Sequence, residues 1–104
     1  MGWLFLCLAG LLEVGWAIGL KYSEGFSRLW PSAWTVLAMI ASFYFLALGL
    51  KTIPVGTGYA VWTGIGAVGT ATLGIALFAE PTTILRLISL ALIVLGILGL
   101  KASS

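Results

Sequence analysis

One acidic side chain, Glu13, lies in the middle of an apolar stretch that runs from Gly2 to Leu20 and holds no other charge. A charge at the centre of a membrane costs roughly 2.5–3.5 kcal/mol on insertion scales, so an acid there usually has a functional role. Such a carboxylate can take up a proton or pair with a cation. A purely structural contact between helices is the weaker alternative, because no cationic side chain lies deep within another apolar stretch.

Small and aromatic residues share the helical face of Glu13. At 3.6 residues per turn, Gly10, Trp16 and Ala17 lie on that face. Gly10 and Ala17 are small enough for another helix or a ligand to approach closely. The indole N–H of Trp16 is a donor that can reach a carboxylate. This face therefore combines one acid, one donor and room for a neighbour.

Further polar, aromatic or small residues occur in the other apolar stretches: Thr35, Ser42, Tyr59, Trp62, Thr63 and Gly66. Brought together with Glu13, they would form a water-accessible cavity with hydrogen-bond donors and aromatic faces, which suits a cation. Two of them have simpler interpretations. Tyr59 lies near the start of its stretch, where it could anchor the membrane interface. Ser42 can equally hydrogen-bond its own backbone one turn back.

The rest of the chain supplies elements that hold these residues in a membrane. Of its 104 residues, 62% are hydrophobic and 8% are charged, against about 25% charged in soluble domains. Charges divide the sequence into apolar stretches at Gly2–Leu20, Ser32–Leu50, Gly58–Ala79 and Ile84–Leu100. A spanning helix needs about 20 residues, with a range of about 17–25. The sequence predicts an all-α membrane protein, in which residues 1–104 form a single four-helix transmembrane domain.

The residue types that are missing exclude several kinds of chemistry. The sequence has no His, Asp, Asn or Gln, which excludes a Ser-His-Asp triad and histidine metal sites. It has no phosphate-binding motif of the Walker type. The net charge of +2 is too small and too scattered for a nucleic-acid surface. We therefore expect a protein that is not an enzyme, with no cofactor, no metal site and no nucleic-acid partner.

Positive side chains are nearly balanced between the two sides of the expected bundle. With four spans, Lys51 and Lys101 lie on one side, and Lys21, Arg28 and Arg86 lie on the other. Orientation normally follows an excess of Lys and Arg on the cytoplasmic side, and here that excess is small. Such a chain could insert both ways round and pair with an opposed copy. A single orientation set by weaker features is the alternative.

Small residues mark two other places of interest. The helix expected over 58–79 contains Gly64 and Gly66, and closely spaced glycines are common sites of helix bending. A bendable helix suits a protein that opens alternately to the two sides of a membrane. Ser89 and Gly96 lie on one face of the last stretch. They form either a seam between two copies or ordinary close packing within one bundle.

Several motifs together resemble the small multidrug resistance family, and the resemblance covers essentially the whole chain. They are Gly10–Ala17 with Glu-Val-Gly-Trp at 13–16, Lys21–Ser32, and Pro54–Gly66 with Trp-Thr-Gly-Ile-Gly at 62–66. Glu80-Pro81 and the ending Gly99-Leu100-Lys101 are similar to the guanidinium exporter branch. The branch that exports polyaromatic drugs typically lacks a Trp at the position of Trp16, and it usually has Ser in place of Thr63.

The resemblance implies an antiparallel, dual-topology homodimer in a bacterial inner membrane, which exchanges protons for guanidinium by alternating access. Glu13 from each subunit would bind both the proton and the guanidinium ion. The resemblance also implies roles for other residues: Trp16, Ser42, Tyr59 and Trp62 as the lining of the site with Gly10 and Thr63 beside them, Gly64 and Gly66 as a helix bend, and Ser89 and Gly96 as part of a dimer seam.

Two other functions remain open. A broader multidrug exporter of quaternary ammonium or polyaromatic cations would share the scaffold, but its substrates have no N–H donors and need a roomier aromatic site. A proton-carrying subunit, like the rotor ring of an ATP synthase, usually has two helices with the acid in the second, whereas Glu13 lies in the first of four. In an exporter, the cation and protons would compete for one carboxylate charge, which couples their opposite movements.

Overall fold

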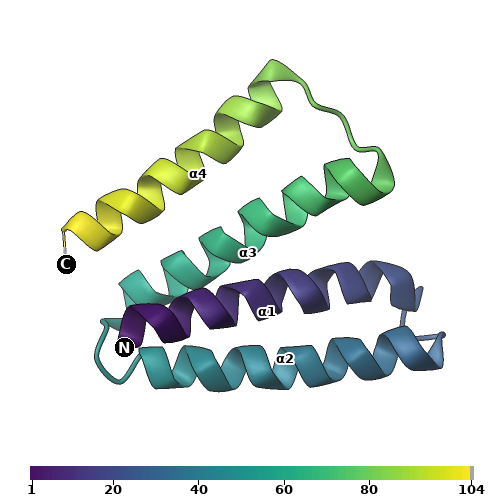
Figure 1. Cartoon of the computed structure of the whole chain (residues 1–104), viewed down its shortest axis with the longest axis horizontal. Coiled ribbons are helices and arrows are strands. Elements are labelled where there is room, and N and C mark those ends of the chain that lie inside the picture. Colours follow the sequence, from purple (N-terminus) through teal and green to yellow (C-terminus); the bar gives the residue numbers. More distant parts are fainter. Residues whose placement is uncertain (104) are drawn as a thin grey trace.

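Four helices make up the computed structural model, which describes residues 1–103 (Figure 1). They are α1 (Gly2–Ser23), α2 (Leu29–Gly49), α3 (Val55–Phe78) and α4 (Ile84–Ala102). Each is long and apolar enough to cross a membrane. The expected all-α architecture with four candidate membrane spans is therefore confirmed.

The helix boundaries differ from the expected ones by a few residues. Helix α1 continues past Leu20 to Ser23, whose hydroxyl donates to the Leu20 carbonyl and accepts from the Phe26 amide, so it closes the last turn. Helix α2 begins at Leu29 rather than Ser32, since a proline is tolerated in a first turn. Hydropathy places the apolar core of a span, whereas capping bonds decide where the helix ends.

Local backbone geometry and capping bonds also set the ends of α3 and α4. Helix α3 begins directly after Pro54 rather than at Gly58, and it ends at Phe78 because Ala79 turns into the left-handed region at φ 54°. Helix α4 begins at Ile84 as expected, where the Thr83 hydroxyl accepts a bond from the Arg86 amide. It runs on to Ala102 instead of ending at Leu100.

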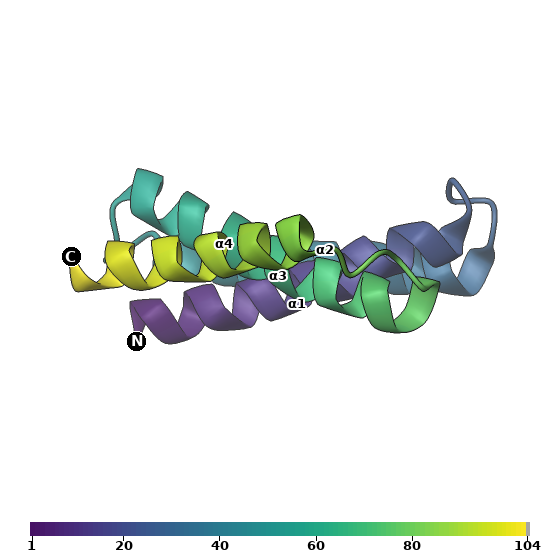
Figure 2. The ribbon, with the colours of Figure 1, turned by 90° about the horizontal axis from the view of Figure 1, so that it is seen from above.

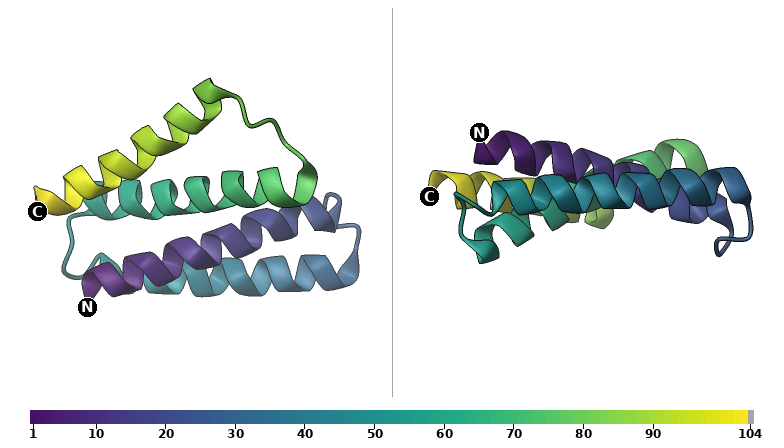
Figure 3. Two further views of the ribbon diagram at one scale, coloured as in Figure 1. Left: turned by 45° about the horizontal axis from the view of Figure 1, so that its top comes forward. Right: turned by 90° about the horizontal axis from the view of Figure 1, so that it is seen from below.

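Helix α1 lies between α2 and α3, as Figures 1 and 3 show from different sides. Glycines make these contacts close. A Cβ added at Gly19 of α1 would collide with the Thr35 side chain of α2, and one added at Gly69 of α3 would collide with Val14 of α1. Membrane helices have no hydrophobic drive toward one another in lipid, so close backbone approach and van der Waals contact hold them together.

The largest buried cluster lies toward the end of the bundle where both chain ends and the α2–α3 connection meet (Figure 1). Leu6, Ile53 and Val61 form its centre. Partly buried hydrophobic side chains pack against it from every helix: Trp3, Leu46, Ile65, Ile97 and Leu100. This cluster ties the four helices together at one end.

Helix α4 diverges from α3 toward the α3–α4 connection (Figure 1). It contacts α3 where Ile93 and Ile97 pack against Gly64, and none of its described residues is buried. The molecule is flat, with extents of 41 × 35 × 16 Å (Figure 2). A single chain therefore leaves most of α4 facing lipid or another protein.

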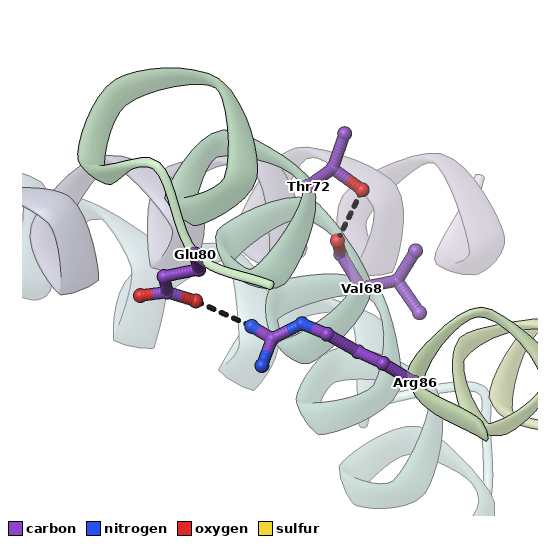
Figure 4. Close-up of polar contacts among 4 residues, drawn as sticks. All are labelled: Val68, Thr72, Glu80 and Arg86. Carbon is purple, nitrogen blue, oxygen red and sulfur yellow. Dashed lines mark hydrogen bonds and ion pairs between the residues drawn. The ribbon is translucent and has the colours of Figure 1, made fainter. Parts of the chain in front are cut away.

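A short polar connection joins α3 to α4. The amides of Ala79 and Glu80 both donate to the Gly74 carbonyl, an arrangement that closes the end of α3. The Glu80 carboxylate lies against Gly74, where any side chain would displace it. Figure 4 shows Arg86 of α4 reaching this carboxylate in a half-exposed ion pair. The pair bridges the connection between α3 and α4.

Candidate functional site

Glu13 lies at the contact between α1 and α3, directly over Gly66. A Cβ at position 66 would overlap the carboxyl group of Glu13, so the acid occupies space that only a glycine leaves open. Its Oε1 atom is buried and makes no hydrogen bond to any described residue. The structure thus places an unsatisfied acceptor in the middle of two apolar helices, as the sequence predicted for Glu13.

Ser42 connects three helices. Its hydroxyl, which is fully buried, donates to the Ala9 carbonyl of α1 at 2.7 Å and accepts from the indole N–H of Trp62 in α3 at 3.0 Å. The alternative that Ser42 bonds its own helix is therefore wrong, because α1 lies close enough to offer a carbonyl. Thr35 is the residue that bonds its own backbone, at Pro31, and it packs against Gly19 away from Glu13.

Four aromatic rings form a row across α1, α2 and α3. Trp16 meets Phe43 at 6.4 Å between ring centroids, Phe43 meets Trp62 at 5.7 Å, and Trp62 meets Tyr59 at 5.5 Å. All three contacts are edge-to-face, with interplanar angles of 63–65°. Edge-to-face pairs are favoured by the ring quadrupoles. The exposed rings of Phe43 and Tyr59 can present a face to a cation.

Phe43 was missed by the sequence analysis. It is one of many apolar residues in its stretch, and nothing in the pattern separates it from the lipid-facing ones. In the structure it follows Ser42, and both residues of α2 contact Trp62. The ring of Phe43 joins Trp16 to Trp62 and is 47% exposed, so it lies at the open edge of this group.

The other predicted site residues differ in how far they are enclosed. Trp62 is 7% exposed and held by Ser42, whereas Tyr59 is 57% exposed. Thr63 is exposed on α3. The indole N–H of Trp16 is buried and makes no bond to a described residue, so it does not donate to Glu13 as the sequence had suggested. Two unsatisfied groups, one acceptor and one donor, therefore lie three residues apart on α1.

Gly10 has a packing role. A Cβ there would collide with the Ile65 side chain of α3, so the close neighbour anticipated at this position is a helix. Gly66 likewise leaves room for the side chain of Glu13, and Gly64 leaves room for side chains of α4. Helix α3 runs without interruption through both glycines.

Thr70, one turn beyond Gly66 and on the same side of α3, was also missed. Its Oγ1 atom is buried without a partner in the described chain. Nearby Thr72 instead bonds the carbonyl one turn back, that of Val68, at 2.8 Å (Figure 4). A helical hydroxyl normally makes this local bond. The only sign in the sequence was a second threonine beside the glycine-rich part of α3.

The residues predicted for a seam lie away from this site. Ser89 and Gly96 are both exposed on α4, and nothing lies within 4 Å of a Cβ at Gly96 among residues 1–103. Ser89 bonds only its own helix, at the Leu85 carbonyl. The sequence left two alternatives for these residues, a seam between two copies or close packing within one bundle. Gly96 does not pack closely against the described part of its own chain.

Taken together, the site offers a carboxylate with an unsatisfied oxygen, an unsatisfied indole donor and a row of aromatic rings that opens at Phe43 and Tyr59. A carboxylate beside aromatic faces suits a cation that carries N–H donors. Residues 1–93 match the family described as Small Multidrug Resistance protein. The chain belongs to the small multidrug resistance family. The resemblance seen in the sequence is thereby confirmed.

Members of the small multidrug resistance family with high identity span the full chain. The guanidinium exporter of Escherichia coli (strain K12) is 64% identical over 104 residues, which cover 100% of this chain and 99% of that protein. The guanidinium exporter of Yersinia pseudotuberculosis is 62% identical over 100% of both chains. That of Salmonella typhimurium is 59% identical over 100% of this chain and 99% of its own.

These relatives also bear on location and class. They are bacterial, and they are named as exporters rather than enzymes. With four helices able to cross a membrane, this member of the family is a multi-pass protein of the bacterial inner membrane. The expectations of a membrane protein without enzymatic activity are confirmed.

Proposed function

We propose that this protein exports guanidinium and small substituted guanidines in exchange for protons. The observation that carries the proposal is Glu13, whose unsatisfied Oε1 lies over Gly66 inside the helix bundle. A planar guanidinium presents paired N–H groups that match the two oxygens of a carboxylate. The relatives named guanidinium exporters, 58–64% identical over the whole chain, support the same substrate.

Coupling follows from competition for one charge. An ionised Glu13 accepts hydrogen bonds from the cation, and a protonated Glu13 has lost that charge. Proton and guanidinium therefore exclude each other, and each releases the other when it binds. If the protein changes the side to which it opens only when the acid is occupied, import of protons drives export of the cation.

The surrounding residues have distinct roles in this proposal. Trp16 supplies the unsatisfied indole N–H next to the acid. Ser42 and Trp62 hold each other across α2 and α3, so the aromatic wall keeps its shape. Tyr59, with Gly10 and Thr63 nearby, completes the lining. Residues 64–66 provide the bend in α3 during the change of access.

The functional unit in this proposal is an antiparallel homodimer that brings two copies of Glu13 together. The support is the flat single chain, the unburied α4 with Ser89 and Gly96, and the nearly balanced positive charges on the two sides. Such a balance suits insertion in both orientations. With two acids in one cavity, the pair would titrate as a unit.

A proteoliposome experiment tests the exporter. A guanidinium gradient across the vesicle membrane should drive protons in the opposite direction. Glu13→Gln should abolish this proton movement while the protein still folds and inserts. Glu24→Gln is the matched control, since Glu24 is exposed in the α1–α2 connection and should exchange normally. Proton-coupled guanidinium uptake by Glu13→Gln would refute the proposal.

The same vesicles distinguish the broader multidrug exporter. The exposed rings of Phe43 and Tyr59 favour that alternative, because bulky aromatic cations could stack there. A tetraphenylphosphonium gradient should drive little proton movement compared with guanidinium if hydrogen bonds to Glu13 select the substrate. Stronger coupling to tetraphenylphosphonium would instead favour the multidrug function. A proton-carrying subunit without transport would show no proton release with either cation.

A further inference from the structure

Figure 1 shows that the two chain ends and the α2–α3 connection meet at one end of the bundle. A cavity of about 430 Å³ is lined by residues of these segments and not by Glu13. It is lined by residues from α1, the connection, the start of α3 and the end of α4: Trp3, Thr52, Ile53, Pro54, Thr57 and Ser103. A water molecule takes up about 30 Å³ in the liquid, so the cavity has room for a polar group of many atoms.

Hydroxyl groups and an indole give this cavity its chemistry. Three lining residues, Thr52, Thr57 and Ser103, carry hydroxyls, and Trp3 carries an indole N–H. The Ser103 hydroxyl donates to the Leu100 carbonyl, so Thr52 and Thr57 are the hydroxyl donors for a ligand. These lining residues come from three separate segments that meet only in the folded chain. A ring of neutral donors around a space of this size suits a ligand with several acceptor oxygens.

Positive charge borders the same cavity. The Lys101 ammonium lies 4.9 Å from the centre of the Trp3 ring, which lines it. Lys51 belongs to the same end of the bundle, directly after α2. The three acidic side chains lie elsewhere: Glu13 in the middle of α1, and Glu24 and Glu80 in the connections at the opposite end. The acceptor oxygens that fit here therefore belong to an anion.

The position of the cavity points to a lipid as the source of that anion. It lies at the ends of membrane-spanning helices, where a tryptophan such as Trp3 normally marks the boundary with the head groups. Leu4, Val55 and Leu98 are more than half exposed on the adjoining turns, so acyl chains can lie along them. Basic pockets between helix ends are known to hold anionic head groups.

We propose that this cavity binds the phosphodiester head group of an anionic phospholipid. The phosphate oxygens accept hydrogen bonds from Thr57 and Thr52, and Lys101 supplies the opposite charge beside Trp3. A lipid held there joins the end of α4 to α1 and to the first turn of α3. Because α4 contacts the other helices mainly at this end, the bound lipid steadies it. The proposal does not depend on the transported substrate.

Native mass spectrometry and thermal unfolding of the detergent-solubilised protein test the site, with phosphatidylglycerol as the probe. Wild-type protein should retain phosphatidylglycerol adducts and unfold at a higher temperature with this lipid than with phosphatidylcholine. Inorganic phosphate at the same concentration should have no effect, because it lacks the acyl chains. Lys101→Gln should weaken lipid retention about fivefold, as one juxtamembrane lysine does near an anionic surface.

Two further variants distinguish a specific lipid site from non-specific electrostatic attraction to anionic lipids. Lys51→Gln removes the same charge from the same end but not from beside Trp3, and it should lose less lipid than Lys101→Gln. Thr57→Val keeps the shape and charge, and its loss of retention would show that the cavity itself is used. Equal losses for Lys51→Gln and Lys101→Gln, full retention by Thr57→Val, or equal stabilisation by inorganic phosphate would each overturn the proposal.

Discussion

The carboxyl group of Glu13 on α1 lies against the backbone of Gly66 on α3, in space that a single added carbon would fill. This relationship makes the glycine as necessary as the acid. A small residue at position 66 lets an ionisable side chain lie between two apolar helices without parting them. The two residues are far apart in the sequence and act as one unit in the fold.

Gly66→Ala should therefore impair transport more than folding. The methyl group displaces the Glu13 carboxylate, and a displacement of about 1 Å from a productive geometry can cost on the order of 100-fold in rate. Guanidinium-driven proton flux in liposomes measures the loss. Gly56→Ala is the control on the same helix, since nothing lies within 4 Å of its Cβ, and it should transport normally. Equal activity of the two variants would show that the Glu13–Gly66 contact is not used.

Ser42→Ala should destabilise the bundle measurably. It leaves the Trp62 indole N–H buried without a partner, and an unsatisfied buried group costs about 1–3 kcal/mol. Unfolding in detergent, followed by tryptophan fluorescence, reports the change. Thr72→Val removes a hydroxyl that is exposed on α3 and bonds only its own helix, so its stability should match that of the wild type within about 0.5 kcal/mol. Similar losses in both variants would argue against the interhelical role of Ser42.

Binding of guanidinium should weaken as the pH falls. Protons fill the Glu13 carboxylate at low pH, and the cation then has to displace them; at high pH the acid is already ionised. For one competing proton the apparent Kd rises by up to about tenfold per pH unit. Isothermal titration calorimetry in two buffers of different ionisation enthalpy gives both the affinity and the protons released. A Kd that does not change with pH, together with no proton release, would show that guanidinium does not bind at the Glu13 carboxylate.

The ion pair between Glu80 and Arg86 should contribute little to stability. The two side chains are 40% and 32% exposed, and exposed pairs are worth about 0–1 kcal/mol. A double-mutant cycle with Glu80→Gln and Arg86→Gln, measured by unfolding in detergent, gives the coupling energy directly. A coupling of about 3 kcal/mol or more would mean that the pair is buried in the functional assembly.

Much of this fold was readable from hydropathy, because a membrane span is a simple compositional signal. The ends of α1 and α3 were not, since they depend on the Ser23 hydroxyl and on the left-handed turn at Ala79. Such caps are local hydrogen bonds and backbone angles, which hydropathy does not record. The span boundaries therefore shifted by a few residues while their number and order held.

The candidate site also contains residues that were evident from the sequence and residues that were not. Glu13 was evident because a charge in an apolar run is costly, and no cationic side chain deep within another apolar stretch favoured a purely structural role. The partners of Ser42 were not, because a serine in a helix can bond its own backbone or a neighbour, and only the approach of α1 decides. Phe43 gave no signal, since an aromatic ring that faces a site and one that faces lipid look alike in sequence.

The divergence of α4 has a practical consequence. Whatever molecules cover the exposed side chains of its first half, such as Ile84 and Leu85, become part of the energetics of the chain. In a bilayer these are acyl chains or a second copy, and after extraction they are surfactant tails. We expect the apparent stability of the purified material to vary with the surfactant and to rise with protein concentration, as it does when association and folding are linked.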